Sequence, residues 1–248
     1  MQYLIIGDVH ADYPPLERAI KFALSNDLHL VSVGDIVDGK EDGAKCVSEL
    51  NKLLDSGKAS IIKGNHEHKI IRALNGADVI LGPPNVATLE QMENDSQFKA
   101  DFRHMVEDHC QQYIKLNENI YITHGGMHKD FWEAEKTDTI SKKMFNTMMF
   151  GEADYKKTYR HNDQDYPYRT YNWKDSVPGH VTLIVGHDPA PLEGQPDFDN
   201  FQVQPTVHTN DIGGTVIWTD CGAGKGGDLF GMVVNSTSSE IEEYINFS

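Results

Sequence analysis

The chain opens with Tyr3-Leu4-Ile5-Ile6-Gly7-Asp8-Val9-His10, a short apolar run followed by a glycine, an aspartate and a histidine. The apolar residues predict a buried β-strand, and the two polar residues fall where that strand ends. Four later signatures repeat this plan along the chain. They read Gly34-Asp35-Ile36-Val37-Asp38, Gly64-Asn65-His66-Glu67, Thr123-His124-Gly125-Gly126 and Gly186-His187.

Alternating strands and helices connect the first three signatures. Strands are predicted at 3–6, 30–33 and 59–63, and helices at 14–24, 44–55 and 67–74. The signatures recur roughly every 30 residues, which is the length of a βαβ unit. The carboxyl ends of parallel strands form the edge at which open α/β sheets bind ligands. We therefore expect Asp8, Asp35 and Asn65 to meet at this edge.

The remaining chain is less regular. A largely polar helical stretch near 89–113 predicts a helical excursion over 77–112 that covers one side of the site. Further strands are predicted at 119–123, 181–185, 215–219 and 229–234. Residues 151–173 carry five tyrosines among charged residues with little periodicity, which is compatible with a surface loop or with a flap over a substrate. No linker divides the chain, so we expect one domain over 1–248.

Bulk composition narrows the class of protein. The chain has 248 residues, 39% hydrophobic and 24% charged, as in a globular protein. No apolar run approaches the roughly 18 residues of a membrane span. A strand and Asp8 occupy the N-terminus, so we expect no cleaved signal peptide. Three scattered cysteines suit a reducing compartment, and we predict a cytoplasmic location. The net charge of −16 argues against a partner with a duplex nucleic-acid backbone.

The polar residues of the signatures form a candidate ligand set without thiolate. Its members are Asp8, His10, Asp35, Asn65, His124 and His187. Carboxylate and amide oxygens suit hard cations, and first-row transition metals also accept imidazole. Asp8 and His10 are two residues apart, so in an extended chain they share one face. The Asp35 carboxylate can bridge two cations about 3.5–4 Å apart. The set predicts two divalent metal ions that activate water.

His66 is expected to play a different role. It directly follows Asn65, so its side chain should point away from the metal that Asn65 binds. We assign His66 as the general acid that protonates the leaving oxygen, and Asp38 as the residue that orients it. In this scheme a metal-bridging hydroxide attacks phosphorus in line, and no phosphoenzyme forms.

The five signatures together resemble those of the calcineurin-like metallophosphoesterases. The similarity is greatest to the phosphoprotein phosphatase type, which includes bacterial and phage Ser/Thr phosphatases and symmetrical diadenosine tetraphosphatases. The run Asp220-Cys221-Gly222-Ala223-Gly224-Lys225-Gly226-Gly227 resembles the family's last strand and turn, so the likeness spans residues 8 to 234. It implies an α/β fold, a four-layer α/β/β/α sandwich, with a dinuclear centre, commonly of manganese (Mn²⁺) or of iron with zinc.

The resemblance also implies how the ligands divide. Metal 1 would be held by Asp8, His10 and Asp35, and metal 2 by Asp35, Asn65, His124 and His187. His66 would be the acid and Asp38 its partner.

Two positions depart from the family pattern. Ala11 stands in place of a glycine. Gly39-Lys40 stands where the family has an arginine that grips phosphate, and Lys40 is one residue late. Arginine grips phosphate with a planar fork, whereas lysine is a point charge. We take Arg169 as the preferred substitute clamp and Arg160 as the second, against the alternative that Arg169 is a plain surface residue.

Three functions follow from this sequence. The first is a phosphomonoesterase of Ser/Thr protein phosphatase type that acts on a phosphorylated protein or a small phosphoester. The second keeps the fold and hydrolyses a dinucleoside polyphosphate or a nucleotide phosphodiester, with the tyrosines of 151–173 stacking on a base. The third is a metal-loaded binding module without catalysis. We predict the first.

Overall fold

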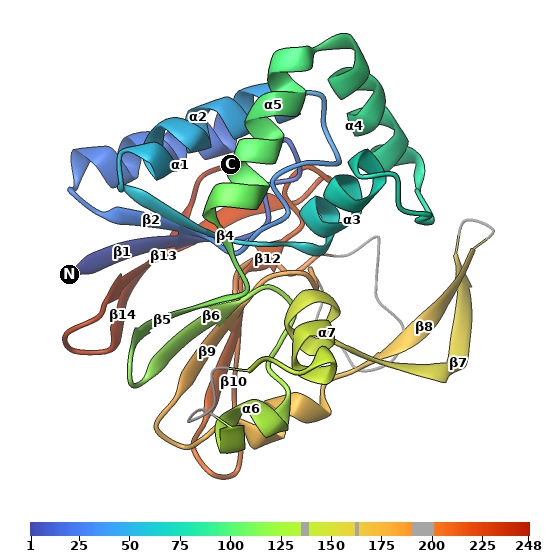
Figure 1. Cartoon of the computed structure of the whole chain (residues 1–248). Helices are drawn as coiled ribbons and strands as arrows, with labels where there is room; N and C mark the ends of the chain where they lie inside the picture. The colour runs from blue at the N-terminus through green and yellow to red at the C-terminus, as the bar shows by residue number, and fades with distance from the viewer. Residues whose placement is uncertain (135–138, 162–163, 190–200) are drawn as a thin grey trace.

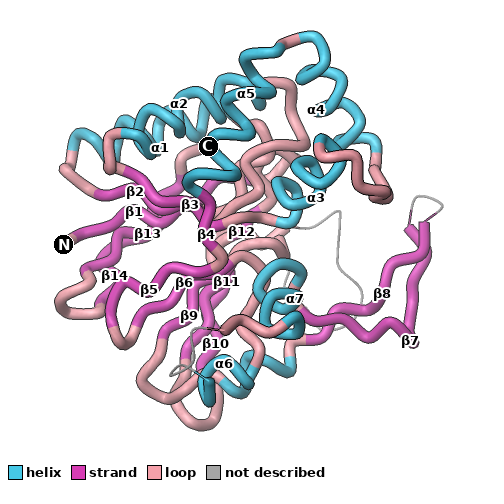
Figure 2. Tube along the Cα trace, in the orientation of Figure 1, coloured by secondary structure: helices cyan, strands magenta, loops and turns pink. Residues whose placement is uncertain are grey.

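Two β-sheets stack face to face, and helices cover the outer face of each (Figures 1 and 2). The structure is a computed structural model, and it describes residues 1–134, 139–161, 164–189 and 201–248. The larger sheet has the strand order β12-β13-β1-β2-β3-β4, with β14 paired to β13. The smaller sheet has the order β10-β11-β9-β6-β5. The α/β/β/α layering predicted from the sequence is confirmed.

The larger sheet contains the parallel strands of the βα repeats. Its strands are β1 (Gln2–Ile6), β2 (His29–Ser32), β3 (Ala59–Ile62), β4 (Cys110–Gln111), β12 (Asp220–Cys221), β13 (Asp228–Asn235) and β14 (Glu240–Asn246). Strands β1 to β4 run parallel, whereas β13 runs antiparallel to β1. The last third of the chain therefore returns to pair with its first strand.

Helices on the outer face of this sheet follow the order of the sequence. They are α1 (Tyr13–Ser25), α2 (Gly43–Asp55), α3 (Asn65–Leu74), α4 (Pro83–Asn94) and α5 (Ser96–His104), followed by a π-helical turn (Met105–His109). Helix α1 begins with Pro14 and Pro15 in its first turn, where no intrahelical N–H is needed. Leu16, Ala19 and Ile20 form its buried face.

The smaller sheet forms the second half of the sandwich. Its strands are β5 (Tyr113–Asn117), β6 (Ile120–Thr123), β9 (Thr182–Val185), β10 (Thr206–Thr209) and β11 (Thr215–Trp218). Helices α6 (Lys129–Ala134) and α7 (Lys142–Phe150) and a 3₁₀ helix (Asn172–Ser176) follow β6 and precede β9 in the chain. Strands β6, β9 and β11 run parallel.

Apolar residues form three clusters that match these layers. The cluster between the sheets includes Ile5 and Val31 from one sheet and Ile122, Ile184 and Ile217 from the other. A second cluster joins the larger sheet to its helices, and a third lies on the outer side of the smaller sheet. The central strands are buried on both faces, so their sequences are continuous apolar runs. Because the two sheets stack face to face, the carboxyl ends of their parallel strands come to one region.

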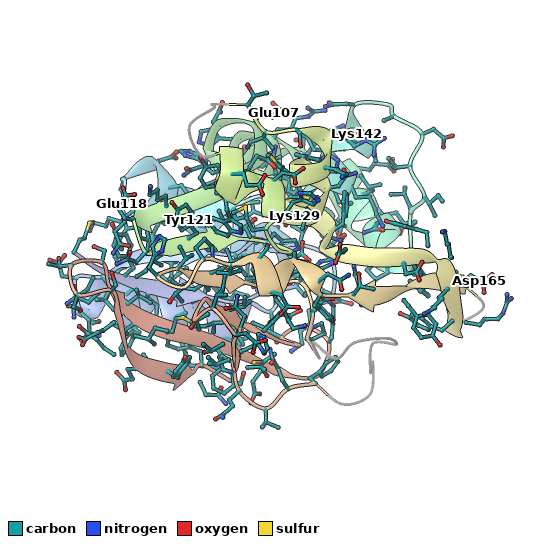
Figure 3. The ribbon with its side chains drawn as sticks, turned by 90° about the horizontal axis from the view of Figure 1, so that it is seen from below. Glu107, Glu118, Tyr121, Lys129, Lys142 and Asp165 are labelled. Carbon is teal, nitrogen blue, oxygen red and sulfur yellow. The ribbon has the colours of Figure 1, made fainter. Side chains whose placement is uncertain are left out.

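Two segments differ in detail from the sequence prediction. The helical stretch predicted at 89–113 is broken at Asp95, whose carboxylate caps the start of α5, and it ends in strand β4. No strands were predicted in residues 151–173, the possible loop or flap, but 152–161 and 164–170 form the strands of a hairpin, β7 (Glu152–His161) and β8 (Gln164–Thr170). The hairpin extends away from the sandwich, and Asp165 lies near its far end (Figure 3). Its tyrosines and threonines favour strand structure despite the weak alternation.

Among the described residues, no helix combines the length and the apolar character needed to cross a bilayer.

The buried face of α1 provides a test of the helix-to-sheet packing. Leu16 is fully buried, whereas Leu24 on the same helix is 47% exposed. Leu16→Ala should lower the free energy of unfolding by about 3 kcal/mol, because it removes buried methyl groups and leaves a cavity. Leu24→Ala should cost less than about 1 kcal/mol. Urea unfolding followed by circular dichroism measures both, and equal losses would contradict the packing described here.

Candidate metal centre and active site

The loops that leave the strands turn sharply at the signature residues. His10, Ala11, Asp35, Asp38 and His187 all have positive φ, between 48° and 71°. Such angles are uncommon outside glycine and gather at functional sites. Each turn directs a polar side chain into the region where the carboxyl ends of the two sheets meet.

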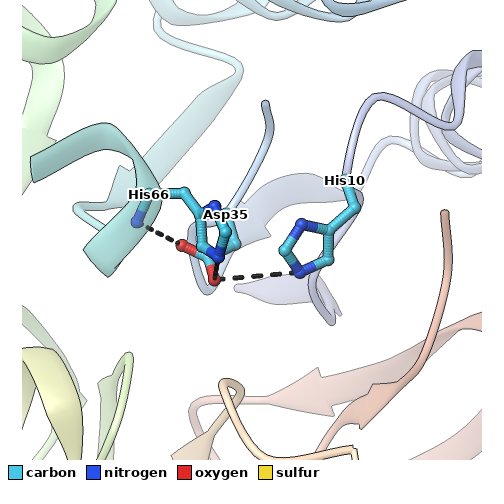
Figure 4. A group of neighbouring side chains, drawn as sticks. All are labelled: His10, Asp35 and His66. Atoms are coloured by element: carbon cyan, nitrogen blue, oxygen red, sulfur yellow. Dashed lines mark hydrogen bonds and ion pairs between the residues drawn. The ribbon is translucent and has the colours of Figure 1, made fainter. Parts of the chain in front are cut away.

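Asp35 lies at the centre of one group of side chains (Figure 4). Its Oδ2 atom is 3.8 Å from His10 Nε2 and 3.8 Å from His66 Nε2. Its Oδ1 atom accepts a hydrogen bond of 3.0 Å from the backbone N–H of His66. On the other side, Asp8 Oδ2 is 3.9 Å from His10 Nε2. His10, Asp35 and His66 thus lie close enough to share an ion, although only His10 and Asp35 belong to the predicted ligand set and His66 is the predicted acid.

A second candidate group shares the same aspartate and consists of Asp35, His124 and His187. His124 Nε2 is 3.4 Å from Asp35 Oδ2 and 2.8 Å from Asn65 Oδ1. His187 Nδ1 is 2.9 Å from the same Asn65 oxygen and 3.2 Å from His124 Nε2. An amide oxygen and two ring nitrogens converge closely enough here to surround one point. This donor set fits a divalent cation.

Backbone contacts fix which ring nitrogen faces the site in two of the histidines. His10 Nδ1–H donates to the Asp38 carbonyl at 2.7 Å, and His124 Nδ1–H donates to the Val33 carbonyl at 2.9 Å. Each bond leaves Nε2 directed into the site, the orientation found in metal-binding histidines. His10 Nε2 is buried and has no hydrogen-bond partner among the described residues. This orphaned atom is evidence that the residues fit a metal.

His187 is held differently, because Arg169 occupies its other nitrogen. Arg169 Nη2 donates to His187 Nε2 at 2.8 Å, and arginine has no acceptor. Burial and the guanidinium both hold the pKa of His187 well below its ordinary value, so the ring is neutral. The proton of the neutral ring then lies on Nδ1, where it donates to Asn65. Metal binding by Nδ1 therefore requires the ring to change tautomer and Arg169 to leave Nε2.

Buried negative charge also favours a bound cation. Burial and the nearby Asp220 raise the pKa of Asp8 well above its ordinary value. Asp220 is fully buried, and its Oδ2 atom lacks a hydrogen-bond partner in the described part of the chain. Bound cations would offset this repulsion. The ligand pattern did not single out Asp220, because it lies in the short strand β12 without a neighbouring histidine.

A hydrogen-bonded chain supports His66. Its Nδ1 lies 2.7 Å from Asp38 Oδ2, and the side-chain amide of Asn85 donates to the same oxygen. Burial opposes protonation of His66, but Asp35 and Asp38 outweigh it and raise the pKa of the ring. Asn85 comes from the first turn of α4. Sequence reasoning missed it because no spacing links Asn85 to the signatures.

Glu67 organises the loops instead of facing the metals. Its carboxylate accepts hydrogen bonds from the backbone N–H groups of Asp35, Ile36 and Gly64, at 2.8, 2.8 and 3.0 Å. The carboxylate thereby ties the loop after β2 to the start of α3. An added Cβ at Gly64 would lie 2.1 Å from Asp35 Oδ1, so only glycine allows this approach.

The three residues considered for phosphate binding lie in different places. Arg169 lines the cavity beside the ligand groups, donates to the Phe150 carbonyl at 2.6 Å and lies 3.4 Å from Asp188 Oδ1. Lys40 Nζ is 2.6 Å from Asp12 Oδ2. Arg160 lies on the outer part of the hairpin, 3.5 Å from Asp165. Lys40 and Arg160 are not among the residues that line the cavity.

Lys225 is a cation at the site that sequence reasoning missed. It follows Gly224, whose φ is +72° and whose added Cβ would lie 2.3 Å from the His10 carbonyl oxygen. The glycine-rich turn therefore packs directly on the backbone of His10. Burial and then the Lys225 ammonium lower the pKa of His10. Lys225 has no ion-pair partner within the described ranges. The sequence did contain a feature that could have identified Lys225, because it is a lysine inside a glycine-rich turn that follows a strand.

A cavity of about 950 Å³ opens from the ligand groups. Asp35, Asn65, His66 and His187 line its inner end. Lys69, Arg169 and Lys225 contribute positive charge. Its other walls include the aromatic residues Phe150, Tyr155, Tyr159, Tyr166 and Phe201. The hairpin β7–β8 thus forms one wall of the cavity that ends at the candidate metal centre.

Known proteins resemble this chain in sequence and in fold. A bis(5'-nucleosyl)-tetraphosphatase PrpE from Anoxybacillus flavithermus, designated asymmetrical, is 24% identical over 212 residues, which cover 77% of this chain and 80% of the relative. The solved structure of a candidate diadenosine tetraphosphatase superposes with a TM-score of 0.58 at 17% identity, covering 99% of this chain and 93% of that one. A protein serine/threonine phosphatase from Saccharomyces cerevisiae superposes with a TM-score of 0.53 at 13% identity, covering 93% and 72%.

The sequence profile described as calcineurin-like phosphoesterase matches residues 1–213, most of the chain. Members of this family normally bind divalent metal ions, in agreement with the candidate ligand groups. The chain belongs to the calcineurin-like phosphoesterase family and is a hydrolytic phosphoesterase.

Proposed function

We propose that this protein hydrolyses dinucleoside polyphosphates in preference to phosphomonoesters. The observation that carries the proposal is the cavity itself. It leads from the candidate metal centre past three cationic side chains to a wall of aromatic rings. A phosphoserine side chain fills only the inner end of such a space, whereas a polyphosphate with a nucleoside spans its length.

Positive charge near the cavity supports a polyphosphate. The chain carries a net charge of −16, so its long-range field repels anions. Lys69, Arg169 and Lys225 nevertheless line this cavity. A substrate with several phosphates gains from each local cation, because each can form a charge-assisted hydrogen bond.

The aromatic residues on the hairpin side of the cavity favour a substrate that contains a nucleoside. Tyr159 and Tyr166 lie with their ring centroids 5.8 Å apart and an interplanar angle of 22°. Tyr155 is 79% exposed although it lines the cavity. Aromatic side chains bind nucleobases by stacking, with little dependence on the base. The curated relatives, named as tetraphosphatases, point the same way.

The chain's own residues then account for the reaction. Two divalent ions, of which manganese is our first expectation, would be held by Asp8, His10, Asp35, Asn65, His124 and His187. When bound, they would supply a hydroxide nucleophile at neutral pH and stabilise the charge on the transferred phosphoryl group. Arg169 and Lys225 bind non-bridging phosphate oxygens and orient the chain of phosphates for in-line attack. His66 donates its Nε2 proton to the departing oxygen while Asp38 holds Nδ1.

The phosphomonoesterase function remains the alternative, because the His66–Asp38 pair suits leaving groups that need a proton. His66 Nδ1 is 2.7 Å from Asp38 Oδ2, an arrangement that would also serve a phosphoserine or phosphothreonine alkoxide. The two functions share the metal centre and differ in what fills the outer cavity.

A comparison of substrates tests the proposal. Purified protein with Mn²⁺ is given diadenosine tetraphosphate, p-nitrophenyl phosphate and phosphoserine peptides, and products are separated by chromatography. We expect kcat/KM for the dinucleotide to exceed that for the monoesters by at least about tenfold. Products of ATP and AMP would indicate asymmetric cleavage, and two ADP symmetric cleavage. Rapid monoester hydrolysis without dinucleotide turnover would overturn the proposal.

His66→Ala tests the acid. The variant should lose about 100-fold or more in kcat on a phosphoserine peptide, because its alkoxide leaves poorly without a proton. It should lose much less on p-nitrophenyl phosphate, whose leaving group needs little protonation. Metal content, measured by elemental analysis, should stay unchanged. The exposed His180→Ala is the matched control, and equal losses on both substrates would exclude His66 as the acid.

Lys225→Ala tests the phosphate contact from the glycine-rich turn. We expect kcat/KM for diadenosine tetraphosphate to fall about 10- to 100-fold, the cost of losing one charged hydrogen bond. Lys225→Arg should restore part of the rate. Lys21→Ala, an exposed lysine paired with Glu17, serves as the control. If Lys40→Ala produced the loss instead, the phosphate would lie nearer the loop after β2.

A further inference from the structure

We propose that Asp55, His104 and His109 form a surface binding site for a divalent transition-metal ion such as zinc or nickel. This site is separate from the candidate active site, and it does not depend on the proposed function. It lies where the end of α2 meets the end of α5 and the π-helical turn. The three ligand atoms all lie within 4.8 Å of one another.

The three side chains lie close enough together to bind one ion, and they are joined by hydrogen bonds when no ion is bound. Asp55 Oδ1 is 2.8 Å from His104 Nε2 and 2.9 Å from His109 Nε2. The two ring nitrogens are 3.4 Å apart. A tetrahedral zinc ion with Zn–N bonds of about 2.0–2.1 Å holds two nitrogens about 3.3–3.4 Å apart. The imidazole pair therefore already has the separation that the ion requires.

The π-helical turn creates this pair. His104 and His109 are five residues apart, and in an α-helix of about 3.6 residues per turn they would diverge by about 140°. Wider winding over Met105–His109, with the Cys110 N–H donating to the Met105 carbonyl, returns both rings to one side. Such turns are rare and often lie at functional sites. Spacing alone hides this pair, because metal-binding histidines on a helix are expected three or four residues apart.

A neighbouring carboxylate prepares His104 for a metal. His104 Nδ1 is 2.8 Å from Asp108 Oδ2. A carboxylate on the remote ring nitrogen is the usual companion of a metal-binding histidine, because it fixes the ring and raises its basicity. Imidazole with one carboxylate suits zinc, nickel or copper better than magnesium or calcium. The remaining coordination positions face solvent, since Asp55 and His104 are half exposed.

The proposed ion would join two parts of the larger sheet's helical layer. Asp55 ends α2, whereas His104 and His109 follow from the excursion that contains α4 and α5. An ion bound only by the folded chain stabilises it in proportion to the logarithm of the free metal concentration. The site thus predicts a metal-dependent rise in the unfolding temperature that is independent of catalysis.

The test compares untagged full-length protein with two variants, His104→Gln/His109→Gln and Asp108→Asn. Calorimetric titration with Zn²⁺ should show one more site per chain in the unmodified protein than in the double variant. Asp108→Asn should keep this site with an affinity about tenfold weaker. All three proteins should hydrolyse the same substrate at equal rates. His180→Gln, an exposed lone histidine, is the matched control and should keep the full stoichiometry.

A measurement at individual residues separates the loss of metal binding from a loss of folding. Circular dichroism without metal first confirms that the variants fold. Ni²⁺ should then broaden the amide NMR signals of 104–109 in the unmodified protein and leave them sharp in the double variant. Equal zinc stoichiometry in both proteins, or no broadening at these amides, would show an ion-paired histidine cluster only and would overturn the proposal.

Discussion

The candidate site depends on the contacts between the buried Asp35 carboxylate and the histidines around it. One of its oxygens lies within 3.4–3.8 Å of ring nitrogens from three histidines that come from three different loops. The aspartate is itself buried and held by the backbone contacts that Glu67 organises. Burying such a carboxylate is costly unless positive charge meets it. The surrounding histidines provide part of that charge, and a bound cation would add to it.

The need to hold this buried carboxylate in place explains why the surrounding loops are fixed by so many hydrogen bonds. Glu67 crosses from α3 to accept the N–H groups of the loop after β2, and Gly64 leaves room for the Asp35 carboxylate. Asn85 fixes the oxygen of Asp38 that also faces His66. These groups do not face the reacting atoms, yet they set the positions of those that do. Fixed dipoles and charges of this kind are what a phosphoryl-transfer site needs.

The proposed substrate preference depends on the outer part of the cavity. The metal-ligand groups can serve any phosphoester, so they cannot choose between a monoester and a dinucleoside polyphosphate. Under the proposed function, the aromatic wall of the hairpin β7–β8, together with Arg169 and Lys225, would distinguish the two. The arginine missing after Asp38 leaves Gly39-Lys40, and Lys40 pairs with Asp12. Lys225 lines the cavity, and we propose that it binds phosphate in place of that arginine.

The sequence by itself predicted the βα repeats, the strands that carry the signatures and the residues expected to meet at their ends, and the family resemblance implied the layered sandwich. This was possible because short apolar runs identify the strands locally, and because parallel strands place their carboxyl ends at one edge of the sheet. The roles of the six ligands remain predictions. Only the tertiary structure placed Asn85, Asp220 and Lys225 beside the signatures. These contacts join residues far apart in the chain, and no local periodicity encodes such long-range packing.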